Sequence, residues 1–247
     1  MILLEEILKA EHRIRPYIRE TFLEFSPYFS ELIGGRVLFK LENQQHTGSF
    51  KFRGAMNRIR ALSPAENKKG IVTASSGNHG AAVAKALTLF KTPGIVYVPE
   101  LVSPAKVKNM EQYGVEVRFK GDDGIVAELE ARQFAADNSV TFISPYNDIL
   151  VASGQGTCGL EIAKQRSEEA ADYIFVAVGG GGLISGIGCY LKSVWPRVKI
   201  IGCQPENSKV MADSVAAGKI LDLTSLPTLS DGTAGGIEPE SITFEYG

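Results

Sequence analysis

A regular alternation of short apolar runs and helix-length segments from Gly70 onward restricts the fold more than any other feature of the sequence. The first series alternates in the order strand, helix, strand: residues 71–74, 78–90, 95–98, 105–113, 115–119, 127–134 and 140–143. Each helix in such a series carries the chain back to begin the next strand in the same direction. The sequence therefore predicts a parallel sheet covered by helices.

A second series of the same kind follows the first. It comprises a helix over 156–165, a strand over 173–178, a helix over 183–194, a strand over 198–203 and a helix over 209–217. Residues 144–153 show no clear periodicity, so we interpret them as a hinge between two units. We also expect the amphipathic helix that ends before Pro16 and the strand over 37–41 to pack on the second unit.

The predicted fold class is therefore α/β, with two three-layer αβα units and mostly parallel sheets. The domain boundaries follow from the hinge. We expect a large domain formed by residues 1–65 plus 148–247, and a small domain formed by residues 66–147. The final residues begin a helix without completing an apolar face, so we expect the chain to be a fragment that lacks part of the large domain.

Composition excludes several classes of partner. The 247 residues carry a net charge of −2, and lysine and arginine are scattered, so we expect no nucleic-acid partner. Cys158, Cys189 and Cys203 are too few and too widely spaced for a disulfide framework, which favours a reducing, cytoplasmic location. The apolar first residues are interrupted by Glu5 and Glu6, so they predict neither a secretory leader nor a membrane anchor.

Lys51 occupies an unusual position, with Phe50 and Phe52 on either side of it, where a polar loop leads into a helix. An apolar wall disfavours the ammonium form and lowers the pKa of a lysine toward that of a reactive amine. Lysines that form Schiff bases need such an environment. The alternative is an ordinary amphipathic helix whose lysine extends past two core phenylalanines.

Four successive glycines, Gly179, Gly180, Gly181 and Gly182, lie between an apolar strand and a helix that begins near Leu183. Such a run exposes backbone N–H groups at the positive end of a helix dipole, which suits a phosphate. A flexible turn is the alternative, although a turn alone would not require four residues that lose so much conformational entropy on folding. The pattern differs from nucleotide-binding loops and fits a single phosphate monoester.

A second polar loop, from Ser75 to Gly80, also joins a strand to a helix. Ser75, Ser76 and Asn78 offer short polar side chains beside free helix N–H groups, an arrangement that suits a carboxylate. The loop is weak evidence alone, because Ser or Asn is common at the start of any helix. His79 has a comparable alternative interpretation, a hydrogen-bonded histidine inside a helix.

A lysine in an apolar environment, a monophosphate site and a carboxylate site together describe a site for pyridoxal phosphate and an amino acid. The three motifs around Lys51, Asn78 and Gly180 resemble, in order and spacing, those of the threonine dehydratase/serine racemase family of pyridoxal-phosphate enzymes, which have the tryptophan-synthase-β-like fold type II. Residues 153–157 and 229–232 also resemble landmarks of this family.

The resemblance implies a cofactor in the cleft between the two units, bound as a Schiff base by Lys51. It implies that Phe50 packs against the cofactor and that Asn78 bonds its ring hydroxyl. The phosphate would be held by backbone N–H groups: Gly179, Gly180, Gly181, Gly182 and Leu183. Ser75, Ser76 and His79 would lie on the loop that binds the substrate carboxylate.

The activity implied is an ammonia-lyase, in which Lys51 removes the α-proton of L-threonine or L-serine and elimination gives a 2-oxo acid and ammonia. Homo-oligomers, dimers or tetramers, are also implied. A serine racemase is an alternative, with Ser76 as the second acid. A non-catalytic module that binds a phosphate ligand is another, because the family residue that bonds the pyridine nitrogen has no counterpart in this sequence.

Racemase-like members of the family bind a divalent cation through a glutamate that precedes a proline. Here the corresponding pair is Gln204-Pro205. A neutral amide is a poorer ligand than a carboxylate for a hard cation, so we expect no metal.

Overall fold

The computed structural model describes residues 2–166 and 169–246, and its first half contains most of the predicted elements with small changes in their ends. In chain order the helices and strands of this half are α1 (Ile2–Ile14), β1 (Leu23–Phe25), α2 (Pro27–Ile33), β2 (Leu38–Lys40), α3 (Lys51–Arg60), α4 (Pro64–Lys69), β3 (Ile71–Ala74), α5 (Asn78–Phe90), β4 (Gly94–Val98), α6 (Pro104–Glu111), β5 (Glu116–Phe119), α7 (Gly124–Asn138) and β6 (Thr141–Phe142). Of these, β1, α2 and α4 were not predicted.

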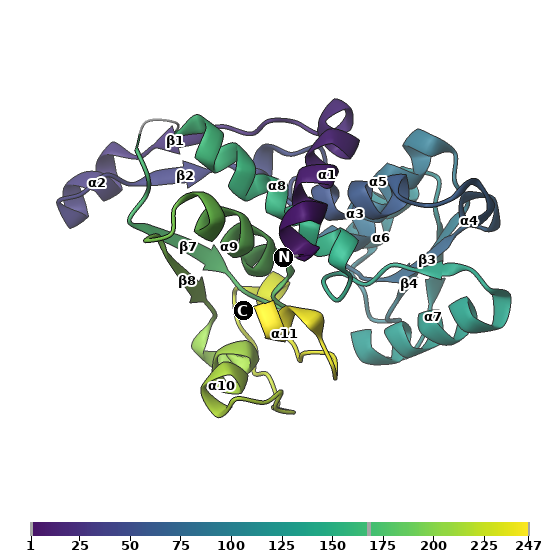
Figure 1. Cartoon of the computed structure of the whole chain (residues 1–247). Helices are drawn as coiled ribbons and strands as arrows, with labels where there is room; N and C mark the ends of the chain where they lie inside the picture. Colours follow the sequence, from purple (N-terminus) through teal and green to yellow (C-terminus); the bar gives the residue numbers. More distant parts are fainter. Residues whose placement is uncertain (1, 167–168, 247) are drawn as a thin grey trace.

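The second half follows the same alternation. Its helices and strands are α8 (Ile149–Gln165), β7 (Tyr173–Ala177), α9 (Gly182–Val194), β8 (Lys199–Cys203), α10 (Val210–Ala217) and α11 (Ile242–Tyr246). Figure 1 shows the sheet of β3 and β4 at one end of the molecule, β7 and β8 toward the other end, and α1, α3 and α8 between them.

Strands β3 to β6 form a four-stranded parallel sheet in the order β5-β4-β3-β6, which confirms the predicted α/β class. Alternate side chains of its strands point to opposite faces, as the two-residue period of a strand requires. Val72 and Tyr97 pack against alanines of α7, whereas Val96 packs against α5 and α6. This sheet is therefore the central layer of a three-layer unit.

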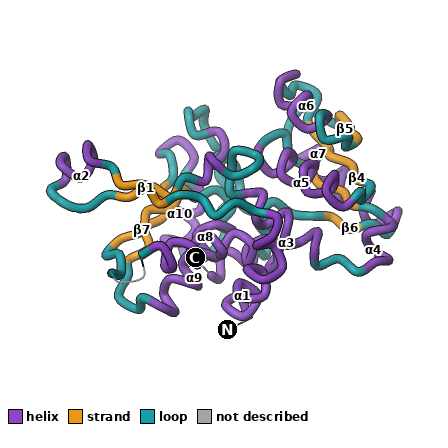
Figure 2. Tube along the Cα trace, turned by 90° about the horizontal axis from the view of Figure 1, so that it is seen from above, coloured by secondary structure: helices purple, strands orange, loops and turns teal. Residues whose placement is uncertain are grey.

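Strands β7 and β8 form a parallel pair that is buried only on the side of α8 and α9. Val176 faces those helices and is buried, while Tyr173 and Phe175 on the opposite face are 51% and 70% exposed. Among residues 2–166 and 169–246, no helix covers this outer face, so the described part of the second unit has two layers. β1 and β2 pair antiparallel, and Figure 2 shows them extending with α2 away from the other elements.

The predicted start of the helix near Gly156 is wrong. α8 begins at Ile149, because the carboxylate of Asp148 accepts hydrogen bonds from the backbone N–H groups of Leu150 and Val151. The segment between β6 and α8 is therefore shorter than the 144–153 that we expected to act as a hinge. Glycines at 154, 156 and 159 weaken the helical pattern of α8, and the pattern was not recognised before Gly156.

Those glycines are explained by helix packing. A Cβ atom on Gly54 of α3 would lie 2.7 Å from the carbonyl oxygen of Val151, and one on Gly154 would lie 2.6 Å from the Cα atom of Gly54. A Cβ atom on Gly186 of α9 would similarly lie 2.6 Å from the backbone nitrogen of Gly156. α3, α8 and α9 can therefore approach one another so closely only because glycine occupies their crossing points.

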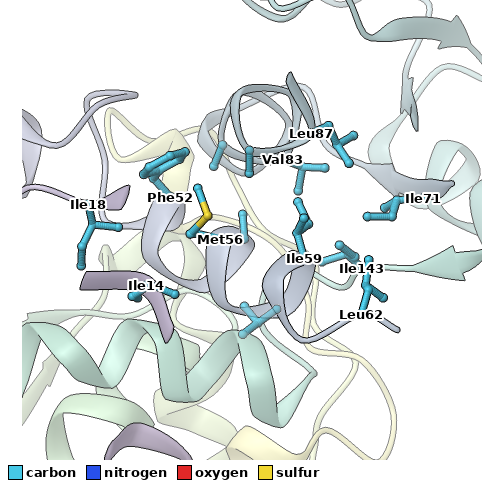
Figure 3. Packing of buried hydrophobic residues seen from close by; sticks show 14 residues of the cluster. Ile14, Ile18, Phe52, Met56, Ile59, Leu62, Ile71, Val83, Leu87 and Ile143 are labelled. Atoms are coloured by element: carbon cyan, nitrogen blue, oxygen red, sulfur yellow. The ribbon is translucent and has the colours of Figure 1, made fainter. Parts of the chain in front are cut away.

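The largest hydrophobic cluster joins α3 to the four-stranded sheet. Phe52, Met56 and Ile59 recur at helical spacing on one face of α3 and are at most 1% exposed. Figure 3 shows this face of α3 packed against Val83 and Leu87 of α5. Each fully buried side chain of this size contributes about 1.5–3 kcal/mol through removal of its apolar surface from water.

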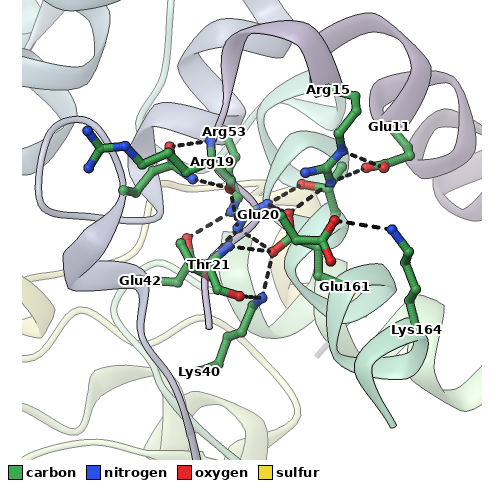
Figure 4. A network of polar contacts seen from close by, with 12 residues as sticks. Glu11, Arg15, Arg19, Glu20, Thr21, Lys40, Glu42, Arg53, Glu161 and Lys164 are labelled. Atoms are coloured by element: carbon green, nitrogen blue, oxygen red, sulfur yellow. Dashed lines mark hydrogen bonds and ion pairs between the residues drawn. The ribbon is translucent and has the colours of Figure 1, made fainter. Parts of the chain in front are cut away.

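A buried ionic network holds a second side of α3, as Figure 4 shows. The guanidinium group of Arg53 is 0% exposed and donates to both carboxylate oxygens of Glu161 on α8, at 2.7 and 2.8 Å. It also donates to Glu42, at 2.7 and 2.8 Å, and Lys40 donates to Glu161 at 2.6 Å. The network links residues far apart in the sequence; Lys40 and Glu161, for example, are 121 positions apart.

The carboxylate of Glu161 remains ionised in this interior. Burial alone would raise its pKa, but hydrogen bonds and ion pairs with Arg53 and Lys40 outweigh burial and lower the pKa to about 2. A carboxyl group whose pKa is lower in the folded state than the ordinary 4.5 stabilises the fold above that ordinary value. This contribution disappears as the pH falls from about 4.5 toward 2.

We expect Glu161→Gln to lower the free energy of unfolding by about 3–5 kcal/mol at neutral pH, because it leaves the buried charge of Arg53 incompletely paired. The same change should flatten the loss of stability between pH 5 and pH 2, to be measured by urea unfolding at a series of pH values. Glu116→Gln, in an exposed pair with Arg118, is the matched control and should cost at most about 1 kcal/mol. Equal losses for the two variants would contradict this account of the network.

Candidate active site

The amino-terminal ends of α3, α5 and α9 converge on one cavity of about 350 Å³. α5 follows β3 and α9 follows β7, so two of the three ends lie at the carboxyl edges of parallel strands, where α/β folds commonly bind ligands. All of the predicted site residues line this cavity: Phe50, Lys51, Ser75, Ser76, Asn78, His79, Gly179, Gly180, Gly181, Gly182 and Leu183. The fold thus brings together motifs that are up to 132 positions apart, from Lys51 to Leu183.

Lys51 is the first residue of α3, and its side chain reaches the connection between β6 and α8. The Nζ atom donates a hydrogen bond of 2.8 Å to the carbonyl oxygen of Pro145 and lies 5.5 Å from the ring centre of Phe50. Burial lowers the pKa of Lys51 to about 8, because no carboxylate in the described chain lies close enough to pair with it. A sizeable fraction of the amine is therefore neutral near physiological pH.

The four glycines form a tight turn between β7 and α9. Gly181 precedes the helix with a φ of +88°, a conformation that residues with a side chain rarely adopt. A Cβ atom on Gly180 would lie 2.3 Å from the ring of Tyr146, so this glycine is required by its neighbour as well. The first N–H groups of a helix have no acceptor within the helix and stay available to an anion.

The loop before α5 presents hydroxyl and amide groups to the cavity. Ser75 and Ser76 are half-buried and Asn78 is exposed, and Asn78 is the first residue of the helix. The hydroxyl oxygen of Ser75 accepts a hydrogen bond from the backbone N–H of Gly77, which bends the loop toward the helix. No side chain caps this helix within the described chain, so its first N–H groups also face an open site.

His79 lies deeper in the cavity wall and is 2% exposed. Its Nε2 atom donates to the carbonyl oxygen of Ile143 at 3.3 Å, which leaves Nδ1 as the unprotonated nitrogen. Burial, and to a smaller extent the charge of Lys51, lower the pKa of His79 to about 3. The imidazole is therefore neutral under ordinary conditions and cannot supply a positive charge to a substrate.

Several cavity residues were not predicted as site residues. Pro145 and Tyr146 belong to the segment that showed no pattern, and Lys106 comes from an unremarkable surface helix. Asp231 lies within a stretch that resembled a family landmark, and its carboxylate is 3.4 Å from the Nζ atom of Lys106. Burial, together with the charge of Glu238, raises the pKa of Tyr146 above its usual range.

Three further features concern metal ligands, membrane-spanning helices and cysteines. Within residues 2–166 and 169–246, no three His, Cys, Asp or Glu side chains form a group that could hold a metal ion. Within the same residues, none of the helices has both the length and the apolar character needed to span a bilayer. All three cysteines are free thiols.

Comparison with curated proteins finds threonine-degrading enzymes. The chain is 39% identical to the L-threonine ammonia-lyase of Thermotoga maritima over 245 residues, which is 99% of this chain and 60% of that protein. It is 36% identical over 244 residues to the catabolic L-threonine dehydratase of Escherichia coli K12, covering 73% of that protein. The chain thus spans about three fifths to three quarters of the length of these relatives.

Comparison with solved structures finds the same group of enzymes. Maize serine racemase superposes with a TM-score of 0.93 at 35% identity, over 98% of this chain and 73% of that one. Threonine deaminase isoform 2 of Solanum lycopersicum gives a TM-score of 0.93 at 32% identity, over 99% of this chain and 66% of that one.

Residues 14–246 match the family model described as "Pyridoxal-phosphate dependent enzyme". The match covers nearly the whole chain, and it agrees with the order of the lysine, serine and glycine motifs and with the superposed structures. The chain therefore belongs to the pyridoxal-phosphate dependent enzymes of fold type II, in the branch that contains threonine dehydratases and serine racemases.

Proposed function

We propose that the protein acts as a pyridoxal-phosphate-dependent ammonia-lyase on L-threonine, L-serine or both. The observation that carries this proposal is the meeting of Lys51, the four-glycine turn and the serine loop in one cavity. The curated relatives named for threonine degradation support the same reaction class. The net reaction removes the α-hydrogen and the β-hydroxyl and, with hydrolysis, gives a 2-oxo acid and ammonia.

The residues of the cavity fit pyridoxal phosphate. The turn from Gly179 to Gly182 offers backbone N–H groups to a single phosphate, and a Cβ atom at Gly180 or Gly181 would fill or strain this cradle. Lys51 provides the amine that the aldehyde of the cofactor requires, and Phe50 provides an apolar surface beside that amine. Asn78, exposed at the start of α5, is available to a polar group on the ring.

When bound, pyridoxal phosphate supplies an electron sink that makes the α-hydrogen of an amino acid acidic. Lys51 then acts as the base that accepts this proton at Nζ, for which a pKa of about 8 is well suited at physiological pH. The carbonyl of Pro145 holds the Nζ atom in a fixed position. His79 is neutral, so its ring adds no positive charge next to Lys51.

The substrate carboxylate is assigned to the loop of Ser75 and Ser76. The hydroxyl groups and the free N–H groups at the start of α5 stabilise a negative charge there, as helix amino termini generally do. In this arrangement His79 contributes as a neutral neighbour rather than as a cation.

Racemisation is a second candidate, supported by the similarity to maize serine racemase. Racemisation requires a proton donor on the face of the substrate opposite Lys51. Ser76 is half-buried and lines the same cavity, so it is the candidate donor. We expect elimination to dominate, because elimination needs no second acid.

The proposal also includes the domain division, the location and the oligomeric state. The division into residues 1–65 plus 148–247 and residues 66–147 is supported by the separation of the two parallel sheets. Free thiols at Cys158, Cys189 and Cys203 support a cytoplasmic location. A homo-oligomer remains an expectation from the family.

Lys51→Ala is expected to abolish both the absorbance of protein-bound cofactor and the release of ammonia, because the other lysine of the cavity lining, Lys106, is paired with the carboxylate of Asp231. The measurements are an absorbance scan and an ammonia assay after gel filtration with pyridoxal phosphate. Lys68→Ala, on the exposed helix α4, is the control and should behave as the unaltered protein. A borohydride-reducible cofactor adduct in the Lys51→Ala protein would assign the covalent link to another lysine.

Gly180→Ala should weaken cofactor binding and lower the stability by about 1–3 kcal/mol, because the added methyl group overlaps the ring of Tyr146. Gly179→Ala is the matched control, since its Cβ atom would make an ordinary contact of 3.4 Å with Thr233. Thermal unfolding and cofactor titration measure both effects. Adding Tyr146→Ala to Gly180→Ala should recover part of the stability, and the absence of any recovery would contradict this steric explanation.

Ser76→Ala should remove most conversion of L-serine to D-serine and leave deamination of L-threonine within about tenfold, or about 1.4 kcal/mol in barrier height. Elimination should survive because Lys51 alone performs the proton removal. A chiral amino-acid assay run beside a 2-oxo acid assay separates the two reactions. Persistent racemisation would exclude Ser76 as the second acid, and a collapse of deamination would assign Ser76 to substrate binding.

A further inference from the structure

The connector between β6 and α8, residues 144–148, touches two separate parts of the proposed active site. The carbonyl oxygen of Pro145 accepts the hydrogen bond from Nζ of Lys51, at 2.8 Å. The ring of the next residue, Tyr146, lies directly against Gly180 of the four-glycine turn. A displacement of this connector would therefore move the acceptor of the reactive amine and the support of the phosphate cradle together.

Glu238 holds this connector in place. Its Oε1 atom accepts from the hydroxyl of Ser144 at 2.9 Å, and its Oε2 atom accepts from the side-chain amide of Asn147 at 3.0 Å. The backbone N–H of Glu238 donates to the hydroxyl oxygen of Tyr146 at 2.8 Å. One residue thus binds three members of a four-residue stretch that lies more than 90 positions earlier in the chain.

Arg132 of α7 approaches Glu238 from the other side. Its guanidinium group donates to Oε2 of Glu238 at 2.6 Å, pairs with Glu128 at 2.7 Å and lies 4.2 Å from the ring centre of Phe142. Glu238 therefore accepts from three side chains with two oxygens, and its side chain is only 17% exposed. Both oxygens of a carboxylate can accept these hydrogen bonds. A glutamine at this position would have one oxygen and one NH2 group, and the NH2 group would face at least one of the three donating side chains.

We propose that Glu238 is a positioning residue that sets the geometry of Lys51 and of the phosphate cradle through the connector. The inference rests on the proposed function, because Lys51 and the four glycines are the groups that it positions. Glu238 lies outside the lining of the cavity and acts only through Pro145 and Tyr146. Neighbours of this kind matter because small displacements of reacting groups reduce rates strongly.

A purely structural role for Glu238 predicts a different pattern of effects. The ion pair with Arg132 ties α7 to the carboxyl-terminal segment, whereas the bonds of Glu238 to Ser144 and Tyr146 do not use the oxygen that Arg132 binds. Loss of this pair alone should lower stability and leave Lys51 unaffected. Arg132→Met therefore tests whether Glu238 only stabilises the fold through this ion pair or also positions Lys51.

The experiment compares Glu238→Ala, Glu238→Gln and Arg132→Met with Glu240→Gln, an exposed glutamate two residues away, as the control. Two quantities are measured besides activity: the pH dependence of Lys51 acetylation in the cofactor-free protein, by mass spectrometry, and the dissociation constant of pyridoxal phosphate. Glu238→Ala should move the acetylation midpoint of Lys51 up toward that of exposed lysines, because water reaches the amine. It should also raise the dissociation constant by about tenfold, as loss of a supporting residue commonly does.

Glu238→Gln should show a smaller change of the same kind, and Arg132→Met should lower the unfolding temperature with both quantities unchanged. The inference is overturned if Glu238→Ala lowers stability and leaves Lys51 acetylation and cofactor affinity at the values of the unaltered protein. It is also overturned if Arg132→Met alters Lys51 as strongly as Glu238→Ala does. Failure of the unaltered protein to bind pyridoxal phosphate would refute the proposed function, and the acetylation comparison would still decide the role of Glu238.

Discussion

The buried pairing of Arg53 with Glu161 and Glu42 fixes the position of α3, and the candidate active site depends on that position. Arg53 lies two residues after Lys51, so the ion pairs that immobilise its guanidinium group also restrict the first turn of the helix. The carboxylates come from α8 and from the loop before α3. Such a cluster gives little net stability compared with an apolar core, but removing one member leaves a buried charge unpaired. The main effect of these ion pairs is therefore to fix the position of α3, and their net contribution to the free energy of unfolding is small.

Close packing of three helices extends this restraint across the molecule. Glycines at the crossings of α3 with α8 and of α8 with α9 allow the backbones to approach within contact distance. With α3 and α9 both held against α8, their amino-terminal ends lie on the same cavity. The positions of Lys51 and the four-glycine turn thus depend on glycines that lie outside the lining of the cavity. These glycines formed part of the sequence landmarks, and the structure explains them as packing positions.

Much of the fold and of the candidate site could be predicted, because their signals are local. β3 and α5 begin and end where the apolar pattern places them, and each predicted site residue sits in a short motif at a strand–helix junction. Tyr146 and Glu238 could not be found in this way, since their importance lies in contacts between segments about 92 positions apart. The start of α8 was missed because its signal is the cap at Asp148, followed by glycines chosen for packing.

Basic side chains of this protein have two kinds of surroundings: some are paired with a carboxylate, whereas Lys51 is buried without one. Arg53 pairs with the carboxylate of Glu161 and Arg58 with that of Asp148, and each pair fixes the position of its side chain. Lys51 meets only the neutral carbonyl of Pro145 in the described chain, and burial without a counter-charge lowers its pKa to about 8. A carboxylate in place of that carbonyl would hold Lys51 as an ammonium ion. The lowered pKa of Lys51 therefore depends on the buried carboxylates, such as Glu161, being paired with arginine and lysine side chains other than Lys51.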